Sequence, residues 1–185
     1  MKKLNLGSGE FKKKGYINID INKDLNPDIV YNLETFPYPF KKNSFDIVEA
    51  DHILEHLSDP FQVMKELHRI LKKDGILIIR VPHFSRALTH PQHKRGFDVS
   101  FPLYFDNDYF GSYTGIQFKC EKMRLHWFAQ KYLMKKHLPK ITYYSLSIIG
   151  TVIDFFANAF PMFCSRIWCF WVGGFYEITY KFKKL

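Results

Sequence analysis

The sequence predicts an α/β domain built on a mainly parallel sheet. Strand-like and helix-like segments alternate over residues 1–86, which is typical of parallel strands joined by right-handed crossovers. A glycine turn at Gly7 and Gly9 follows the first apolar run, and an amphipathic helix precedes an apolar run at residues 76–81 that only Arg80 interrupts. Such a run suits a central parallel strand, which is buried on both faces.

Short apolar runs and turn residues place the individual elements. Four strands are expected at residues 4–6, 16–20, 28–32 and 45–50. The helix that follows begins at Ser58 or Asp59, either of which can cap it, with Pro60 in its first turn. Its apolar stripe has helical spacing, and we expect it to continue to Lys72–Lys73, where Gly75 takes the left-handed conformation that ends it. The stripe consists of Val63, Met64, Leu67, Ile70 and Leu71.

Size and charge limit the possible functions. A chain of 185 residues with 46% hydrophobic content suits one domain, residues 1–185, and excludes a disordered tail or a disulfide-stapled mini-protein. The net charge of +9 indicates an anionic partner: nucleic acid, an anionic membrane or a phosphorylated substrate. Three cysteines without a C-x-x-C pair favour a reducing compartment. The apolar run that ends at Gly7 is too short for a signal peptide, so we expect a cytoplasmic protein.

The glycine turn and an acid after the second strand predict an adenosine ligand. In parallel sheets, ligands bind beyond the carboxyl ends of the strands. Glycine lets the backbone approach a ligand there, although an isolated turn of this kind is equally well explained as a plain tight turn. Asp20 can accept the hydroxyls of a ribose. The third glycine of the dinucleotide fingerprint is replaced by Lys12, and the carboxylate of Glu10 would repel a pyrophosphate. The pattern therefore favours S-adenosylmethionine over NAD.

Five segments, in order, carry a resemblance to a known family. They are Leu-Asn-Leu-Gly-Ser-Gly at 4–9, Gly-Tyr-Ile-Asn-Ile-Asp at 15–20, Phe-Asp-Ile-Val at 45–48, His-Ile-Leu-Glu-His-Leu at 52–57 and Leu-Lys-Lys-Asp-Gly at 71–75. The chain resembles the class I S-adenosylmethionine-dependent methyltransferases, in particular a small bacterial and archaeal type 11-like kind often found with glycan and lipid biosynthesis. The resemblance implies a Rossmann-like, doubly wound, mostly parallel seven-stranded sheet with an antiparallel last strand.

The resemblance also implies a set of cofactor-binding residues. It places the glycine turn at the methionine end of S-adenosylmethionine, Asp20 on the ribose, and two residues after the third strand beside the adenine. Residues after the fourth strand form the cofactor floor. The sequence departs from the family because only residues 11–15 separate the first two strands, too few for a crossover helix. The implied set is Leu6, Gly7, Ser8, Gly9, Asp20, Ile21, Asn32, Leu33, Ala50, Asp51 and His52.

A basic, histidine-rich segment follows the fifth strand, and the resemblance directs it toward the methyl group. His83 and His93 are candidate catalytic bases, because a neutral histidine can accept the proton of a hydroxyl or amine. Arg86 and Arg95 could hold an anionic group of the substrate. The same segment also fits a solvated basic loop, and methyl transfer can proceed by positioning alone. The spacing of its histidines with Asp98 matches no strong metal template, so we expect no metal. We interpret His56 as a structural residue packed under the following helix.

The C-terminal third is dominated by apolar side chains. Residues 116–127 and 176–182 are expected to be the last two strands, with a helical insertion at 128–175 over the face that binds the ligands. Within it, residues 145–164 are long enough to span a membrane, but Asp154 near the middle costs about 3 kcal/mol on insertion. We therefore reject a span. A buried helical cap, a homodimer interface and a peripheral contact of residues 141–175 with an anionic membrane stay open.

These patterns predict a methyltransferase that uses S-adenosylmethionine. Residues 1–86 form the cofactor-binding half, 87–115 a substrate loop and 128–175 the apolar cap. The acceptor is expected to be a small molecule, a glycan or a lipid-linked compound, with oxygen preferred over nitrogen. An RNA methyltransferase is the nearest alternative, less favoured because the aromatic residues lie in long apolar runs. The second alternative is a catalytically inactive, membrane-associated scaffold that keeps the methyltransferase fold. The expected location is the cytoplasm, with the inner face of the membrane as a second site.

Overall fold

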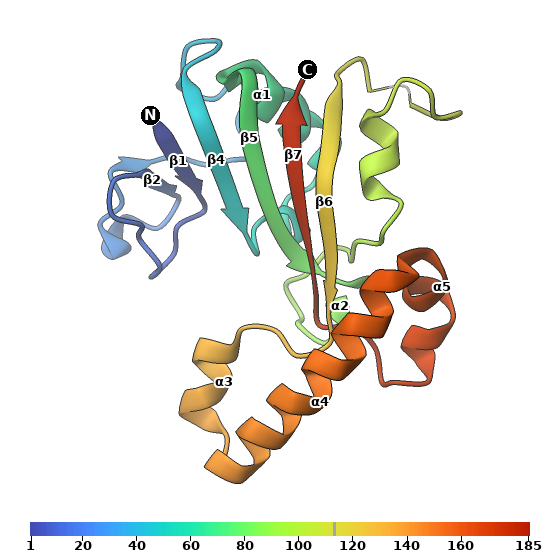
Figure 1. The fold of residues 1–185 in the computed structure, drawn as a ribbon. Coiled ribbons are helices and arrows are strands. Elements are labelled where there is room, and N and C mark those ends of the chain that lie inside the picture. The colour runs from blue at the N-terminus through green and yellow to red at the C-terminus, as the bar shows by residue number, and fades with distance from the viewer. Residues whose placement is uncertain (113) are drawn as a thin grey trace.

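Seven strands form one sheet in the computed structural model, which describes residues 1–112 and 114–185. The strand order is β3-β2-β1-β4-β5-β7-β6 (Figure 1). β7 runs antiparallel to both of its neighbours, whereas the other pairs are parallel. This arrangement confirms the predicted fold class. The strands are β1 (Lys3–Leu6), β2 (Ile17–Asp20), β3 (Ile29–Val30), β4 (Phe45–Asp51), β5 (Leu71–Pro82), β6 (Phe118–His126) and β7 (Glu177–Lys184).

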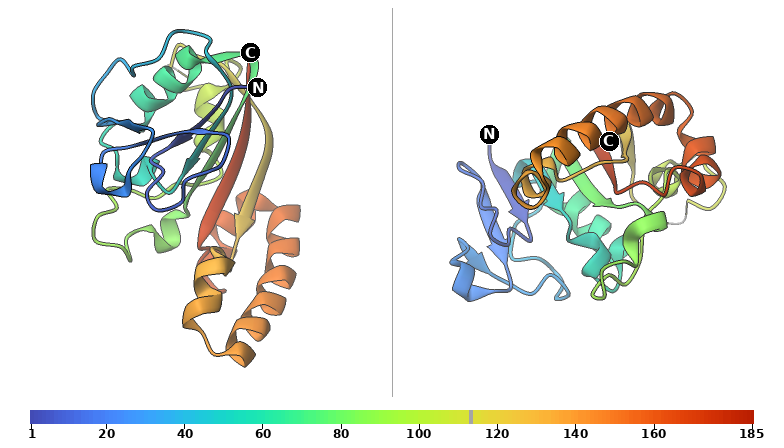
Figure 2. Two further views of the ribbon diagram at one scale, coloured as in Figure 1. Left: turned by 90° about the vertical axis from the view of Figure 1, so that its left-hand side faces the viewer. Right: turned by 90° about the horizontal axis from the view of Figure 1, so that it is seen from below.

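The helices form two groups in sequence: one group precedes β6, and the other lies between β6 and β7. Before β6, α1 is the main helix, and α2 and three 3₁₀ turns are short. Between β6 and β7, four helical elements form the predicted insertion and extend beyond the carboxyl ends of the parallel strands (Figures 1 and 2). The helices are α1 (Pro60–Ile70), α2 (Phe84–Ala87), α3 (Lys131–His137), α4 (Lys140–Ala159) and α5 (Pro161–Arg166), with 3₁₀ turns η1 (Lys23–Leu25), η2 (Leu54–His56), η3 (Phe101–Phe105) and η4 (Trp168–Phe170).

Helix α1 begins where the sequence predicts and ends earlier. Asp59 caps it, because its side chain accepts a hydrogen bond of 3.0 Å from the backbone N–H of Gln62. The helix ends at Ile70, since Leu71 already pairs with Phe45 as the first residue of β5. The prediction that the helix continues to Lys72–Lys73 and ends at Gly75 is therefore wrong. The left-handed residue of this turn is Asp74, with φ of +61°.

The two faces of the sheet are built differently. On one face, α1 and the segment at residues 97–105 bury side chains such as Leu6, Val48 and Leu77 (Figure 2). On the other face, the alternate residues of β4 and β5 are only partly buried, with isoleucines toward the amino ends of the strands and the charged Glu49, Asp51 and Arg80 toward the carboxyl ends. Within the part of the chain that the structure describes, no helix joins β1 to β2, as the short connection predicts.

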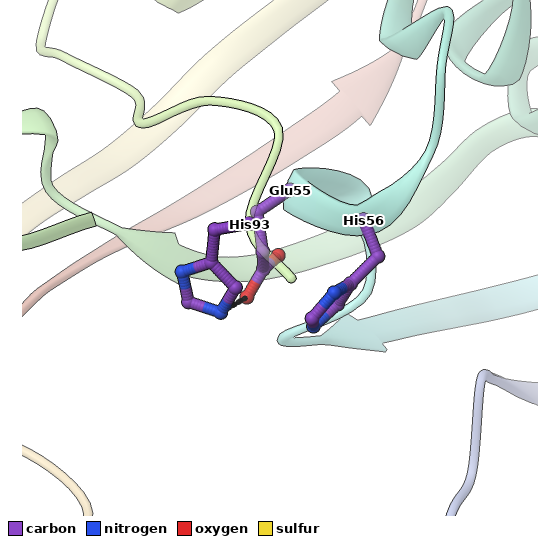
Figure 3. Close-up of side chains that lie close together, drawn as sticks. All are labelled: Glu55, His56 and His93. Carbon is purple, nitrogen blue, oxygen red and sulfur yellow. Dashed lines mark ion pairs between the residues drawn. The ribbon is translucent and has the colours of Figure 1, made fainter. Parts of the chain in front are cut away.

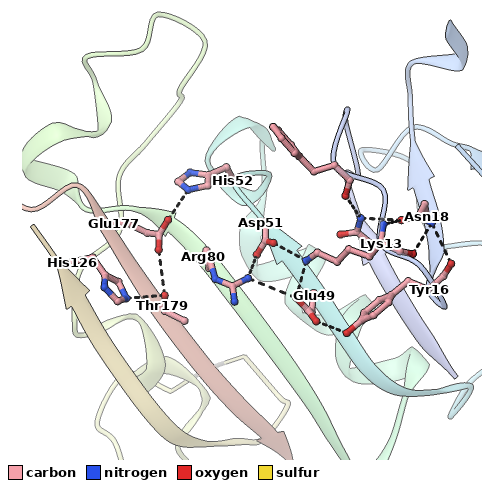
Figure 4. A network of polar contacts seen from close by, with 12 residues as sticks. Lys13, Tyr16, Asn18, Glu49, Asp51, His52, Arg80, His126, Glu177 and Thr179 are labelled. Carbon is pink, nitrogen blue, oxygen red and sulfur yellow. Dashed lines mark hydrogen bonds and ion pairs between the residues drawn. The ribbon is translucent and has the colours of Figure 1, made fainter. Parts of the chain in front are cut away.

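Paired charges occupy the face that lacks a crossover helix. Lys13, from the β1–β2 connection, contacts Glu49 and Asp51 of β4 at 2.7 Å each, and Arg80 of β5 contacts Asp51 at 2.5 Å (Figure 4). The Tyr16 hydroxyl donates to Glu49, and burial together with this carboxylate raises the pKa of Tyr16 to about 12. Because these charges neutralise one another, the sheet tolerates partial exposure without an apolar layer above it.

Helix α4 turns Asp154 and Asn158 to the sheet and exposes many of its large apolar side chains. Asp154 accepts a hydrogen bond from the backbone N–H of Trp127 at 2.7 Å, and Asn158 bonds both backbone groups of Leu125. The outward side chains of α4, α5 and η4, which we call the apolar helical surface, are strongly exposed. They include Ile141 (83%), Ile148 (67%), Phe155 (73%), Phe160 (69%), Phe170 (67%) and Trp171 (76%). Of the helices that the structure describes, none combines the length and apolar character needed to cross a bilayer.

Candidate active site

The glycine turn after β1 is shaped by left-handed backbone at both glycines. Gly7 has φ of +64° and Gly9 has φ of +49°, values that L-residues with side chains rarely adopt. A Cβ on Gly7 would lie 2.6 Å from Cγ1 of Ile53, so glycine is also required there by space. The turn is tied to β2 because the N–H of Ser8 donates to the carbonyl of Ile19 at 3.0 Å.

Asp20, at the end of β2, is brought directly beside this turn. Its Oδ2 accepts from the backbone N–H of Gly9 at 2.8 Å, and its Oδ1 accepts from that of Asn22 at 2.9 Å. These bonds fix the carboxylate at the carboxyl edge of the sheet. The glycine turn and the acid thus form one site, as the sequence predicts for parallel strands.

The end of β4 supplies the next part of the site. Ala50 is fully buried, and Asp51 belongs to the charge network on the open face. His52 has φ of +51°, and its ring lies between two carboxylates, with 3.2 Å from Nδ1 to Glu55 and 2.8 Å from Nε2 to Glu177. Figure 4 shows the contact with Glu177. Burial lowers the pKa of His52, but the hydrogen bonds to Glu177 and Glu55 outweigh it and raise the pKa to about 9. The ring is therefore a cation at neutral pH.

A cavity of about 320 Å³ opens beside His52 at the carboxyl edge of the sheet. Four histidines and one arginine contribute to its wall. Residues from three distant parts of the chain meet here: the end of β4, the segment after β5 and both ends of the helical insertion. The lining residues are His52, His56, Pro82, Arg86, Thr89, His90, His93, Gln130 and Tyr176.

Comparisons with known proteins agree with this geometry. Residues 14–79 match the family model described as a methyltransferase domain. A stretch of 57 residues is 33% identical to an uncharacterized methyltransferase of Schizosaccharomyces pombe. The matched stretch is 31% of this chain and only 20% of the S. pombe protein. Among solved structures, an S-adenosylmethionine-dependent methyltransferase from Archaeoglobus fulgidus superposes with a TM-score of 0.60 and 17% identity, covering 99% of this chain and 86% of that chain. The chain is similar to the class I S-adenosylmethionine-dependent methyltransferases in sequence over residues 14–79, and it shares their fold over nearly its whole length.

The chain also has a fold similar to that of a protein whose structure was solved with the cofactor bound. Phosphoethanolamine N-methyltransferase 2 of Haemonchus contortus, solved with S-adenosyl-L-methionine, superposes with a TM-score of 0.60 and 14% identity, covering 100% of this chain and 49% of that chain. The methyl donor of the family is S-adenosylmethionine.

The residues of this chain fit that cofactor. The Ser8 hydroxyl is buried without a hydrogen-bond partner among the described residues, and a Cβ on Gly9 would meet no atom within 4 Å. A polar ligand group could therefore lie against the turn. Asp20 keeps lone pairs that its two backbone bonds do not use, which suits ribose hydroxyls. Ile21 is 64% exposed beside it, an apolar side chain that a purine would cover.

The structure brings part of the predicted acceptor site together. His93 and Arg86 both line the cavity. The Nδ1–H of His93 donates to the carbonyl of Ala87 at 2.7 Å, so its Nε2 carries the lone pair, and burial lowers its pKa and keeps the ring neutral. The Arg86 Nε–H donates to the carbonyl of Gly173 at 2.7 Å, and its guanidinium lies 5.8 Å from the ring centre of Trp127.

Three other residues lie elsewhere. His83 is fully buried between Ser85 and Ser165, with its ring nitrogens 2.7 and 2.8 Å from their hydroxyls, so it has no path to an acceptor and serves packing instead. Arg95 donates to the carbonyl of Ser58 at 2.7 Å and does not line the cavity. Asp98 pairs with Arg166 at 3.0 Å, apart from the histidines.

Sequence reasoning missed several residues of the cavity wall. Gln130 and Tyr176 stand just inside the two ends of the helical insertion, so the position of the insertion boundaries could have indicated them. Glu55 and His56 belong to the family-like segment, but membership of that segment alone assigns the histidine no chemical role; the structure places His56 in the cavity wall. Glu177 is the first residue of β7, and nothing in the local sequence pairs it with His52, 125 residues earlier.

Proposed function

We propose that this methyltransferase transfers a methyl group to a hydroxyl oxygen of a small-molecule, glycan or lipid-linked acceptor held in the histidine-lined cavity. The observation that supports the proposal is the position of this cavity. It begins at His52, next to the cofactor floor, and ends at the basic segment after β5. An acceptor there would lie at the methionine end of a cofactor bound along Gly7, Gly9 and Asp20.

The chain's own residues supply position and proton handling. S-adenosylmethionine, when bound, supplies a methyl group on a positively charged sulfur that leaves as a neutral thioether. A hydroxyl acceptor must lose its proton as its oxygen forms the new bond to carbon, and the lone pair on Nε2 of neutral His93 lies in the cavity wall. Arg86 is placed to hold a phosphate or carboxylate of the acceptor.

Thermal unfolding tests the cofactor site. We expect S-adenosylmethionine and S-adenosylhomocysteine, added separately, to raise the unfolding midpoint, and NAD to leave it unchanged. Ligand at about 100 times its dissociation constant stabilises a protein by about 2.7 kcal/mol, which is enough for a visible shift. A shift with none of the three would favour the scaffold alternative. A shift followed by methyl transfer to lipid or glycan acceptors would support the full proposal.

The apolar helical surface supports a lipid-linked acceptor. Its helices turn polar residues inward and expose Ile148, Phe155 and Trp171, which reverses the usual pattern of a helix in water. Exposed Lys131, Lys135, Lys136 and Lys140 flank it at the α3–α4 end. Because apolar side chains enter the headgroup region while lysines meet anionic lipids, we propose an anionic bilayer as the occupant.

The charge of the chain disfavours a second copy on this surface. Two copies would bring the same lysine clusters and two net charges of +9 together. The three cysteines are free, which agrees with a reducing compartment, and we propose the cytoplasmic face of a membrane as the location.

Flotation with vesicles tests this surface. We expect binding to vesicles that contain phosphatidylglycerol, weaker binding in 0.5 M salt because screening removes the lysine attraction, and none to pure phosphatidylcholine. Phe155→Ser should reduce binding, whereas Phe110→Ser, which changes a 93% exposed phenylalanine outside the surface, should not. Absence of flotation together with a dimer in ultracentrifugation that Phe155→Ser dissociates would make this surface an interface between copies.

A further inference from the structure

Glu55, His56 and His93 form a cluster of ligand-type side chains, in which the two histidines line the cavity and Glu55 is buried beside them. Each offers one ligand atom, and the three atoms lie within 4.8 Å of one another (Figure 3). Figure 3 shows the carboxylate of Glu55 beside the two imidazole rings, which come from η2 and from the segment after α2. A four-coordinate zinc site has ligand atoms roughly 3.4 Å apart, given metal–ligand distances near 2.1 Å. Small side-chain rotations would therefore bring the cluster to coordination geometry.

The buried carboxylate of Glu55 has an unused oxygen. The side chain is fully buried, and its Oε1 accepts from Nδ1 of His52 at 3.2 Å. Its Oε2 is buried and has no hydrogen-bond partner among the described residues. An unpartnered carboxylate oxygen in a protein interior is costly, and a cation beside it would remove that cost.

Both histidines are oriented as metal ligands usually are. His93 donates its Nδ1–H to the carbonyl of Ala87 at 2.7 Å, and Nδ1 of His56 lies 3.2 Å from the carbonyl of Gln92. Because each Nδ1 carries the proton for a backbone carbonyl, each Nε2 keeps its lone pair. Such a second bond, which fixes the tautomer and the ring direction, accompanies most metal-binding histidines. The carboxylate of Glu55 is likewise oriented by a second contact, the hydrogen bond that its Oε1 accepts from Nδ1 of His52.

We propose that Glu55, His56 and His93 bind one divalent first-row transition-metal ion, with its remaining coordination positions open to the cavity. Two imidazoles and one carboxylate form the ligand set of catalytic zinc sites that keep an open position, and the same set suits other first-row ions. The set does not include Asp98, whose spacing from the histidines matches no metal template.

The site would also change the role of His93 in the proposed reaction. Its Nε2 would hold the ion and would not accept the acceptor's proton. An acceptor hydroxyl at an open position would instead have a lowered pKa and release its proton to solvent before its oxygen bonds to the methyl carbon. This role rests on the proposed function, whereas metal binding itself does not.

Metal titration of chelator-treated protein tests the site. We expect one Zn²⁺ per chain by calorimetry and by metal analysis after dialysis, and a visible absorption band with Co²⁺ of the kind that histidine coordination gives. His93→Ala and Glu55→Gln should each weaken Zn²⁺ binding at least tenfold. His56→Gln, at a partly exposed position, gives a third variant with little risk to folding.

Two control variants distinguish coordination by these three side chains from Zn²⁺ binding at other histidines. His90→Ala changes a neighbouring cavity histidine outside the proposed set, and His137→Ala changes an exposed histidine of α3; both should keep the wild-type affinity. Unchanged Zn²⁺ binding in His56→Gln and His93→Ala, or no binding by the wild type, would overturn the site. The thermal shift with S-adenosylmethionine, measured on the same samples, reports the cofactor site separately, so that failure of one proposal is distinguishable from failure of the other.

Discussion

At the scale of single residues, Asp20 joins the glycine turn to the second strand. Its carboxylate accepts from the N–H of Gly9 and keeps lone pairs for a ligand. We expect Asp20→Ala to weaken S-adenosylmethionine binding at least tenfold, because two ribose hydroxyls lose a charged acceptor worth about 1.5–3 kcal/mol per bond. Calorimetric titration measures the affinity. Asp24→Ala, at an exposed acid of η1, is the matched control, and equal affinity in the two variants would disprove the ribose assignment.

The residue scale also shows what the sequence could predict about the site. The proximity of Gly7, Gly9 and Asp20 was predictable, because these residues follow or end two adjacent parallel strands and the carboxyl ends of such strands lie at the same edge of the sheet. The pairing of His52 with Glu177 was not, because β7 reaches β4 only across β5 and after the long insertion. His83, predicted as a catalytic base, is fully buried and does not line the cavity; the sequence could not indicate this, because a histidine after a strand has the same sequence signature whether it faces a cavity or is buried.

At the scale of elements, α4 depends on polar anchors to the sheet. Asp154 accepts from the N–H of Trp127 and lies near His126, with 3.6 Å between a carboxylate oxygen and Nδ1. Asp154→Ala leaves that backbone N–H without its partner, so we expect a loss of about 1–3 kcal/mol in the free energy of unfolding. Urea unfolding measures it. Thr151→Ala, on the exposed side of the same helix, should change stability by less than about 0.5 kcal/mol. A loss for Thr151→Ala as large as that for Asp154→Ala would contradict the assigned anchor.

The same anchors show why the character of the insertion was harder to predict than its position. Alternation of apolar and polar residues located the last two strands, and the insertion between them followed. In the sequence, the acid in the middle of α4 indicates only an obstacle to membrane insertion. Its bond to β6 depends on tertiary contact, which helical spacing alone does not reveal.

At the scale of the whole molecule, buried neutral histidines make stability depend on pH. Burial lowers the pKa of His83 to about 4, and burial together with Lys184 lowers that of His68 to about 4. Both titrate near 6.5 when unfolded, so between pH 6.5 and 4 the unfolded chain binds more protons. Stability is therefore complete above pH 6.5 and falls as the pH falls toward 4, by roughly 3 kcal/mol for the fully buried His83.

Urea midpoints at pH 7.0 and 5.5 measure this effect, in a range above the titration of most carboxylates. His52, with its raised pKa, acts in the opposite direction, because its stabilising contribution begins to fall as the pH rises through 6.5; it therefore offsets part of the loss caused by the two neutral histidines between pH 7.0 and 5.5. We expect a lower midpoint at pH 5.5 in the wild type and a smaller difference between the two pH values in His83→Gln. The exposed His137→Gln should keep the wild-type difference. A wild-type midpoint that does not change between the two pH values would show that His83 and His68 do not titrate as described.

The open face of the sheet divides the strands into two sets of positions that should tolerate mutation under different rules. On the covered face, where Val48 and Leu77 lie, a substitution must preserve volume. On the open face, Lys13 and Arg80 balance Glu49 and Asp51, so a substitution at these four positions must preserve the sum of charges and is less restricted in size and shape. Sequences that diverge from this one can therefore change at these positions when charges are gained and lost in pairs, while the covered side of the same strands stays nearly fixed.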